Sequence, residues 1–296
     1  MNTEPLVSVI VPVYNAASTL PKLADALLKQ SLSPLEIIFV DDQSSDNSLL
    51  CCQHYAKQHP ERIRVIAMAH KGYAGGCRNV GIQAARGLYV GFADADDSLK
   101  AEMFACLYAA AEKEHAEMAV CGFQQKQARY TRDILPAATL NAASLAADKR
   151  FSAALWNKLL RRDWLLDHDI FCPAVRCAED AAFMLKVLSQ NPRIASVPLP
   201  LYEYSIHGAG LSAPMQARCD VLAALDDVRA YIASHPPRLP FGALYRHAVV
   251  MHALYHPFCL LVIDSLWHGR RRWQNLRESP RYLWHAVRFL LRGLRL

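Results

Sequence analysis

The sequence predicts an α/β protein in which helices flank a mostly parallel sheet and a helical extension follows at the C-terminus. Strand-like and helix-like segments alternate from residue 7 to residue 122, which is typical of parallel strands joined by helices. The first strand-like segment is a nearly continuous apolar run, as expected when helices cover both faces of a sheet. No apolar run reaches the ~18–20 residues that a membrane-spanning helix needs, so a soluble globular protein is expected.

Each element follows from its own pattern. Residues 7–13 (VSVIVPV) are rich in β-branched side chains and predict a strand, and residues 16–30 space Leu20, Leu23 and Leu27 along one helical face. Corresponding patterns predict further strands at residues 36–40, 62–68, 88–93 and 118–122, and further helices at residues 44–59, 74–86 and 101–115.

The second half of the chain is less regular. Its pattern predicts helices at residues 156–166 and 179–188, and short strands at residues 194–204 that prolines interrupt. After Ser212 the chain is expected to be mostly helical.

Charge and cysteine content limit the function classes. The net charge is +6, but from Leu211 onward there are twelve Arg, no Lys and five acidic residues. Eight of these arginines lie between Arg270 and Arg295, which predicts an anionic partner for that end.

The nine cysteines have no regular framework of spacings, which argues against a secreted disulfide scaffold and favours the cytoplasm. The N-terminus has no basic segment, so no signal peptide is expected.

Polar side chains follow three of the predicted strands at the point where each strand ends. They are Tyr14-Asn15, Asp41-Asp42 and the run from Asp94 to Asp97. Ligands of open parallel sheets bind beyond the carboxyl ends of the strands. Carboxylates so close together repel one another unless a cation or a hydrogen-bonding ligand lies among them. Capping of the next helix is the alternative, which is favoured for Asp46 but not for the run from Asp94 to Asp97.

Two common nucleotide-binding motifs are absent. The segment after the first strand, VYNAAS, contains neither G-x-G-x-x-G nor G-x-x-x-x-G-K-[ST]. The glycines at residues 72–76 follow the third strand and lack the fingerprint spacing. A dinucleotide dehydrogenase and a P-loop NTPase are therefore disfavoured.

Four segments in order carry a family resemblance. Together they resemble glycosyltransferase family 2 over about residues 6–212. The segments are VSVIVPVYNAASTL, EIIFVDDQSSDNS, GCRNVGIQAARGLYVGFADADD, and WNKLLRR with the later CAEDAAF. The resemblance implies the GT-A fold and inverting transfer of a sugar from a sugar nucleotide.

The resemblance also implies roles for single residues on the nucleotide-sugar side. These residues are Pro12, Tyr14, Asp41, Asp42, Arg78, Asp94 and Ala95. Pro12, Tyr14 and Asp42 correspond to the wall and the acid that hold the nucleobase and ribose, with Asp41 beside them. Arg78 corresponds to a basic residue near the nucleotide, and Asp94 with Ala95 to the first part of the D-x-D motif.

The resemblance also implies which residues bind a metal ion and which residue accepts the proton of the acceptor hydroxyl. Asp96 corresponds to the ligand of a divalent cation, Mn²⁺ or Mg²⁺, and Asp97 is expected to extend the pair through water. His207 corresponds to a group that completes the metal or diphosphate site. Ser205 stands where many relatives carry Arg. The cation neutralises charge on the leaving diphosphate. Asp180 corresponds to the catalytic base, with Glu179 beside it, and a single base without a protein nucleophile implies inversion at the sugar.

The resemblance divides the chain into three parts. Residues 1–123 are expected to bind the nucleotide sugar, residues 124–212 to bind the acceptor and hold the base, and residues 213–296 to form a basic helical extension. We expect Trp156 and Asn157 to pack the acceptor half against the sheet together with Lys158; a direct contact of Lys158 to the diphosphate is the alternative.

The end of the chain predicts a membrane contact. Between residues 279 and 296, Leu283, Val287, Leu290 and Leu294 recur at helical steps and arginines occupy another part of the helix, as in basic amphipathic helices at membrane surfaces. We expect the protein on the cytoplasmic face of the inner membrane; a helix packed on the catalytic domain is the alternative. No motif indicates nucleic-acid binding.

The expected activity is transfer of a sugar, from a UDP-sugar in first place, to a glycan or glycolipid acceptor of a cell-surface polysaccharide such as lipopolysaccharide or capsule. One alternative is a nucleotidyltransferase that makes a sugar nucleotide, but Pro12–Asn15 replaces the glycine- and arginine-rich loop that such an enzyme needs. The other is a non-catalytic glycan- or lipid-binding protein. The intact carboxylates at Asp94, Asp96 and Asp180 argue against it.

Overall fold

Parallel strands form the first half of the sheet. The computed structural model describes residues 4–127, 130–142, 152–205 and 216–238. Four strands pair in parallel in the order β3-β2-β1-β4, with bounds Ile63–Ala67, Leu35–Asp41, Val7–Val13 and Tyr89–Phe92. Every residue of β2 is buried, and β1 leaves only Pro12 partly exposed. The predicted burial of residues 7–13 on both faces is confirmed.

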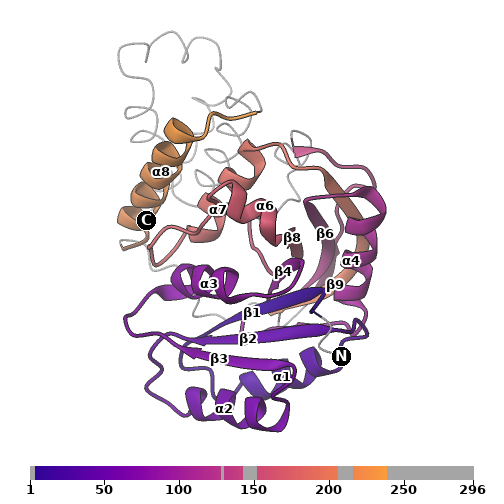
Figure 1. The fold of residues 1–296 in the computed structure, drawn as a ribbon, viewed down its shortest axis with the longest axis vertical. Coiled ribbons are helices and arrows are strands. Elements are labelled where there is room, and N and C mark those ends of the chain that lie inside the picture. Colours follow the sequence, from indigo (N-terminus) through magenta and orange to yellow (C-terminus); the bar gives the residue numbers. More distant parts are fainter. Residues whose placement is uncertain (1–3, 128–129, 143–151, 206–215, 239–296) are drawn as a thin grey trace.

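Helices cover both faces of the sheet (Figure 1). One face buries side chains of α1 (Leu20–Leu28), α2 (Ser48–Gln58) and α4 (Met103–Glu114). The other buries side chains of α3 (Tyr73–Ala84) and of three later helices, α6 (Arg162–Asp167), α7 (Glu179–Ser189) and α8 (Gln216–Ser234). Helix α3 lies directly on β1 because Gly81 has no side chain: a Cβ there would lie 2.3 Å from a methyl group of Ile10.

The second half of the sheet is mixed. Its strands are β5 (Ser98–Leu99), β6 (Met118–Gln127), β7 (Tyr130–Ile134), β8 (Lys158–Arg161) and β9 (Ile194–Ser205). Strand β8 lies antiparallel between β4 and β6, whereas β6 and β9 run parallel and β5 pairs antiparallel with β9. The sheet order β3-β2-β1-β4-β8-β6-β9-β5 therefore joins both halves of the chain in one layer.

Three sequence predictions in this half need correction. The helix predicted at residues 156–166 begins only at Arg162, in α6 (Arg162–Asp167), because Lys158–Arg161 pair as a strand. The strand predicted at residues 118–122 continues to Gln127. Residues 194–204 form part of one strand, whose register with β6 shifts twice between Val197 and Tyr202. Long-range pairing decides each case, and local periodicity does not report it.

The domain boundary predicted at residues 123/124 falls within β6, so the two predicted halves share a strand. Helix α8 (Gln216–Ser234), from the predicted extension, packs on α7 (Glu179–Ser189). There Lys186 pairs with Asp227 at 2.5 Å. No helix in these described parts of the chain is long and apolar enough to span a membrane. The basic segment at residues 270–295 lies outside the described residues.

Candidate active site

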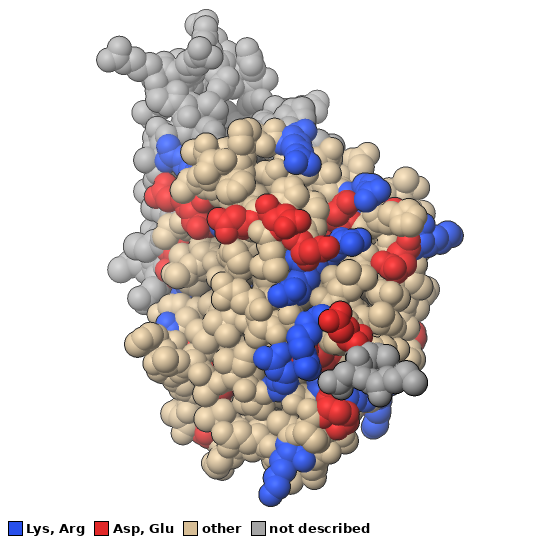
Figure 2. All heavy atoms as spheres, viewed as in Figure 1, with Lys and Arg blue, Asp and Glu red and all other residues tan. Residues whose placement is uncertain are grey.

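The carboxyl ends of β1, β2 and β4 meet at one edge of the sheet, as predicted. The Asp42 N–H donates to the Val13 carbonyl at 2.8 Å, and the Ala93 N–H donates to the Ile10 carbonyl at 3.2 Å. The segments that follow the three strands therefore start side by side. On the face that Figure 2 displays, acidic side chains form a band across the upper part of the molecule, above the level at which Figure 1 draws β1, β2 and β3.

Asp42 and Asp41 point to different partners. Asp42 is buried, and its carboxylate accepts hydrogen bonds from the Gly72 N–H at 2.6 Å and the Tyr73 N–H at 3.0 Å. It therefore anchors the start of α3. Asp41 accepts from the Ser44 N–H with one oxygen, while its buried Oδ1 has no hydrogen-bond partner among the described residues. A buried acceptor without a partner is costly unless a ligand donates to it.

Pro12 and Tyr14 form the accessible part of this edge. Pro12 is partly exposed within β1, and the Tyr14 side chain is half-exposed directly after it. The ammonium of Lys71 lies 3.6 Å from the centre of the Tyr14 ring, in a cation–π contact. Sequence analysis did not single out Lys71, because its partner is distant in the chain and no motif marks it.

Arg78 connects two acidic segments of the site. From α3, its guanidinium pairs with the Asp94 carboxylate at 3.1 Å and with the Glu179 carboxylate at 2.7 Å. The side chain of Arg78 is 6% exposed. Burial raises the pKa of Asp94 and of Glu179, although the positive charge of Arg78 opposes that rise. Arg78 thus fixes the loop after β4 relative to the start of α7.

A glycine permits this close approach. A Cβ at Gly75 in α3 would lie 2.9 Å from the Pro173 carbonyl oxygen and 3.2 Å from the Glu179 Cβ. The absence of a side chain therefore lets α3 pack against the segment that leads into α7. That packing brings Arg78, one turn later in α3, within reach of Glu179.

The D-x-D segment forms a turn with one exposed carboxylate. The Asp97 N–H donates to the Asp94 carbonyl at 3.1 Å. Asp96 is exposed, Ala95 is 9% exposed and the Asp94 side chain 34% exposed. Asp97 is buried, and its carboxylate accepts a hydrogen bond from the Tyr202 hydroxyl at 2.8 Å. The expectation that Asp97 extends the metal-binding pair through water is therefore wrong, because its side chain points into the protein.

These carboxylates fit a cation that a nucleotide brings with it. Within the described ranges, no three His, Cys, Asp or Glu side chains form a cluster that could hold a metal ion by themselves. Mg²⁺ and similar hard ions, however, need only one or two protein carboxylates when phosphate oxygens complete the coordination. Exposed Asp96, with Asp94 beside it, meets that requirement. His207 lies outside the described residues, so its role stays a prediction.

Glu179 and Asp180 occupy the first turn of α7 but differ in their contacts. The Glu179 carboxylate forms an ion pair with Arg78. Asp180 is partly exposed, accepts a hydrogen bond from the Ala181 N–H with one oxygen, and makes no ion pair within the described residues. A carboxylate in the first turn is also stabilised by the helix dipole. Of the two, Asp180 is the one whose carboxylate is not held in an ion pair within the described residues.

Lys158 serves packing and does not reach the site surface. It is fully buried in β8, and its ammonium donates to the Ser152 carbonyl at 2.7 Å, the Ala154 carbonyl at 2.6 Å and the Asn157 side-chain oxygen at 2.7 Å. The predicted packing role is confirmed, and the alternative of a direct diphosphate contact is wrong. Burial lowers the pKa of Lys158 to about 7.

Replacing Lys158 with Met is expected to flatten the pH dependence of stability. Between about pH 7 and the ordinary lysine pKa of about 10.4, the unfolded chain holds a proton that the folded chain has released. Lys158 therefore makes the free energy of unfolding rise with pH in this window, by roughly 1 kcal/mol per pH unit. Urea unfolding of both proteins from about pH 6 to about pH 10 measures the difference. Parallel profiles would contradict the assignment.

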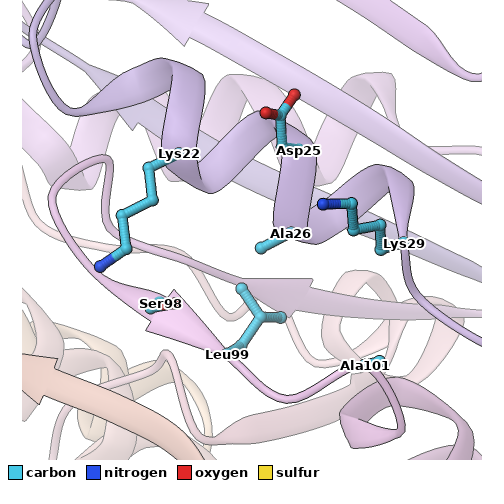
Figure 3. A pocket seen from close by; sticks show the side chains of 7 residues that line it. All are labelled: Lys22, Asp25, Ala26, Lys29, Ser98, Leu99 and Ala101. Carbon is cyan, nitrogen blue, oxygen red and sulfur yellow. The ribbon is translucent and has the colours of Figure 1, made fainter.

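A separate shallow pocket of about 320 Å³ lies between α1 and β5 (Figure 3). Lys22, Asp25 and Lys29 line it from the helix, and Ser98 and Leu99 line it from the strand. None of the predicted site residues lines this pocket.

Comparison with known proteins gives consistent matches. The sequence profile of glycosyl transferase family 2 matches residues 8–176. A protein described as uncharacterized glycosyltransferase EpsJ, from Bacillus subtilis, is 36% identical over 216 residues, which are 68% of this chain and 61% of EpsJ. The poly(ribitol-phosphate) beta-N-acetylglucosaminyltransferase TarS of Staphylococcus aureus is 26% identical over 69% of this chain and 36% of its own length. The chain thus matches less than two thirds of the length of these curated relatives.

Solved structures share the fold. Residues 1–349 of TarS, in complex with UDP-GlcNAc, superpose with a TM-score of 0.70 at 22% identity, over 91% of this chain and 78% of that one. The mannosyltransferase PcManGT of Pyrobaculum calidifontis, in complex with GDP-Man and Mn²⁺, gives a TM-score of 0.55 at 18% identity, over 90% of this chain and 88% of that one.

Proposed function

The chain belongs to glycosyl transferase family 2 and has a fold consistent with GT-A, and from that premise we propose an inverting transfer of one sugar to a hydroxyl group of a glycan or glycolipid. The proposed donor is a nucleoside-diphosphate sugar, with a UDP-sugar in first place. Proteins similar to this chain support the choice of a nucleoside-diphosphate sugar, since TarS was solved with UDP-GlcNAc and PcManGT with GDP-Man.

One observation carries the proposal. Arg78 ties the Asp94 loop to the start of α7 through two ion pairs, and this leaves Asp96 exposed on one segment and Asp180 partly exposed on the other. An exposed carboxylate for a metal diphosphate and another for an acceptor hydroxyl are the two groups that such a transfer requires.

The proposed mechanism assigns a separate task to each residue. Tyr14 offers a ring to the nucleobase. Oδ1 of Asp41, which has no hydrogen-bond partner in the part of the chain that the structure describes, accepts a hydrogen bond from the base or ribose. Asp96, with Asp94 beside it, would hold Mn²⁺ or Mg²⁺, which would neutralise charge on the departing diphosphate. Asp180 takes the proton of the acceptor hydroxyl as the oxygen of that hydroxyl attacks the anomeric carbon of the donor sugar. No enzyme–sugar bond forms, so the configuration of the sugar inverts.

The setting of the reaction is also part of the proposal. The basic segment at residues 270–295 is proposed to bind an anionic membrane surface on the cytoplasmic side, where a lipid-linked acceptor of a surface polysaccharide would be presented. A nucleotidyltransferase and a non-catalytic binding protein are less favoured, because the family match is to transferases of glycosyl groups and the site keeps its exposed carboxylates.

A nucleotide panel tests the proposal. UDP, GDP, CDP and CMP are each added with and without Mn²⁺, and the melting temperatures of the protein and of Asp96→Ala are measured. We expect a Mn²⁺-dependent rise with one diphosphate, because a ligand that binds only the folded state stabilises it, and loss of the metal-dependent part in Asp96→Ala.

The matched control is Asp226→Ala, which removes another exposed carboxylate, on α8. It should behave as the unsubstituted protein does. A folded protein that responds to none of the nucleotides, or an Asp96→Ala variant with an unchanged metal-dependent rise, would overturn the donor-site assignment.

A further inference from the structure

One tyrosine from the second half of the chain holds both ends of the D-x-D turn. The Tyr202 hydroxyl accepts a hydrogen bond from the Asp94 N–H at 3.1 Å and donates one to the Asp97 carboxylate at 2.8 Å. The turn itself closes with the hydrogen bond from the Asp97 N–H to the Asp94 carbonyl. The phenol oxygen therefore joins the two residues that flank Ala95 and Asp96.

The position of Tyr202 is itself fixed by aromatic packing. Tyr202 is fully buried in β9, and its ring stacks on Trp156 with centroids 4.4 Å apart and planes 10° from parallel. Trp156 also stacks on Tyr204, with centroids 5.4 Å apart, and forms a T-shaped pair with Phe123, with centroids 4.8 Å apart. A ring packed in this way cannot swing out of the protein without opening the aromatic cluster.

The chemistry of the contact suits a permanent clamp. Burial, and the negative charges of Asp94 and Asp97, raise the pKa of the Tyr202 hydroxyl well above its ordinary value. The hydroxyl therefore keeps its proton, which it donates to Asp97, and one lone pair, which accepts from the Asp94 N–H. A hydrogen bond to a buried carboxylate belongs to the stronger kind.

We propose that Tyr202 is a positioning residue for the metal diphosphate, acting through the turn from Asp94 to Asp97 and never touching the ligand. Its hydroxyl fixes the backbone of the turn with Asp97 turned inward and Asp96 exposed. The inference rests on the proposed function, because it assigns the cation to Asp96.

Tyr202→Phe tests the clamp, since it keeps the stacked ring and removes both hydrogen bonds. The Asp94 N–H and the Asp97 carboxylate each lose their hydrogen bond to the phenol oxygen, so the turn loosens. We expect the Mn²⁺ concentration for half-maximal diphosphate binding to rise by about tenfold, which corresponds to about 1.4 kcal/mol. Affinity for the nucleotide without metal should stay unchanged. Bound Mn²⁺ is followed by electron paramagnetic resonance, and nucleotide binding by calorimetry.

Tyr204→Phe is the matched control, since it removes the hydroxyl of the other tyrosine stacked on Trp156. It should leave the Mn²⁺ requirement unchanged. An unchanged requirement in Tyr202→Phe, or an equal loss of affinity with and without metal, would overturn the clamp.

A second variant covers the case in which Tyr202→Phe does not fold. Asp97→Asn keeps the shape of the acceptor but removes its charge, so a rise in the Mn²⁺ requirement smaller than that of Tyr202→Phe is expected. An unchanged requirement counts against the proposal.

If the unsubstituted protein shows no metal-dependent binding of any diphosphate, the proposed function fails, and the clamp with it. If that protein binds and the variants bind equally, only the clamp fails.

Discussion

Asp180→Asn is expected to lower turnover by ~10²-fold or more and to leave donor binding unchanged. The amide has the size of the carboxylate but cannot take up the proton of an acceptor hydroxyl. Asp180 makes no ion pair within the described part of the chain, so its replacement should not disturb the fold. Steady-state kinetics with a fixed acceptor, together with the dissociation constant of the donor, separate the two effects.

Glu179→Gln is the informative companion to this variant. Glu179 is held by Arg78 at 2.7 Å, so its loss should reduce stability as well as activity. Turnover of Asp180→Asn at the level of the unsubstituted protein would move the base elsewhere. Glu179 would be considered first, because burial raises its pKa and thereby makes it a stronger base.

Arg78→Met is expected to destabilise the fold by about 3–5 kcal/mol and to abolish activity. The substitution leaves two carboxylates, Asp94 and Glu179, without the cation that lies between them. The estimate is an upper one for Asp94, whose side chain is one third exposed and partly screened by water. Chemical denaturation of both proteins measures the change.

The pH dependence of that variant gives a sharper check. Without Arg78, burial and mutual repulsion should raise the pKa values of Asp94 and Glu179 further. A carboxyl group with a raised pKa in the folded state contributes stability at low pH that is lost as the pH rises through that value. The deficit of Arg78→Met should therefore shrink as the pH falls toward the ordinary carboxyl range.

Arg64→Met is the matched control for Arg78→Met. Arg64 is also paired with a buried carboxylate, that of Glu36, but it is 38% exposed, and Glu36 keeps Arg86 as a second partner. Its loss should therefore cost much less than the loss of Arg78. Equal destabilisation by the two substitutions would show that the bridge between Asp94 and Glu179 has no special role.

The sequence predicts the first half of the fold well for a physical reason. Strands β1 and β2 are covered on both faces, so each is a nearly continuous run of apolar residues that the sequence shows directly. Residues 158–161 give a weaker signal, because Leu159 and Leu160 are buried only through pairing of β8 with β4 and β6. A helix and a short buried strand have similar patterns over such a length.

The candidate site shows the same limit. The motifs locate Asp94, Asp96 and Asp180, but they do not show which carboxylate already has a partner inside the protein. Asp97 looks like a third ligand in the sequence and proves to be an anchor for Tyr202. The pattern YEYSIHGAGLS contains Tyr202 without marking it, since its partners lie more than 100 residues earlier in the chain.

The pairing of β5 with β9 has a consequence for synthesis of the protein. Strand β5 directly follows the D-x-D turn, whereas β9, which carries Tyr202, leaves the ribosome only after the intervening strands and helices. A nascent chain can form its early parallel strands before then, because domains fold as their segments emerge. Its turn, however, still lacks both hydrogen bonds from the Tyr202 hydroxyl. If the proposed function holds, the turn is therefore fixed for the metal diphosphate only near the end of translation of the described fold.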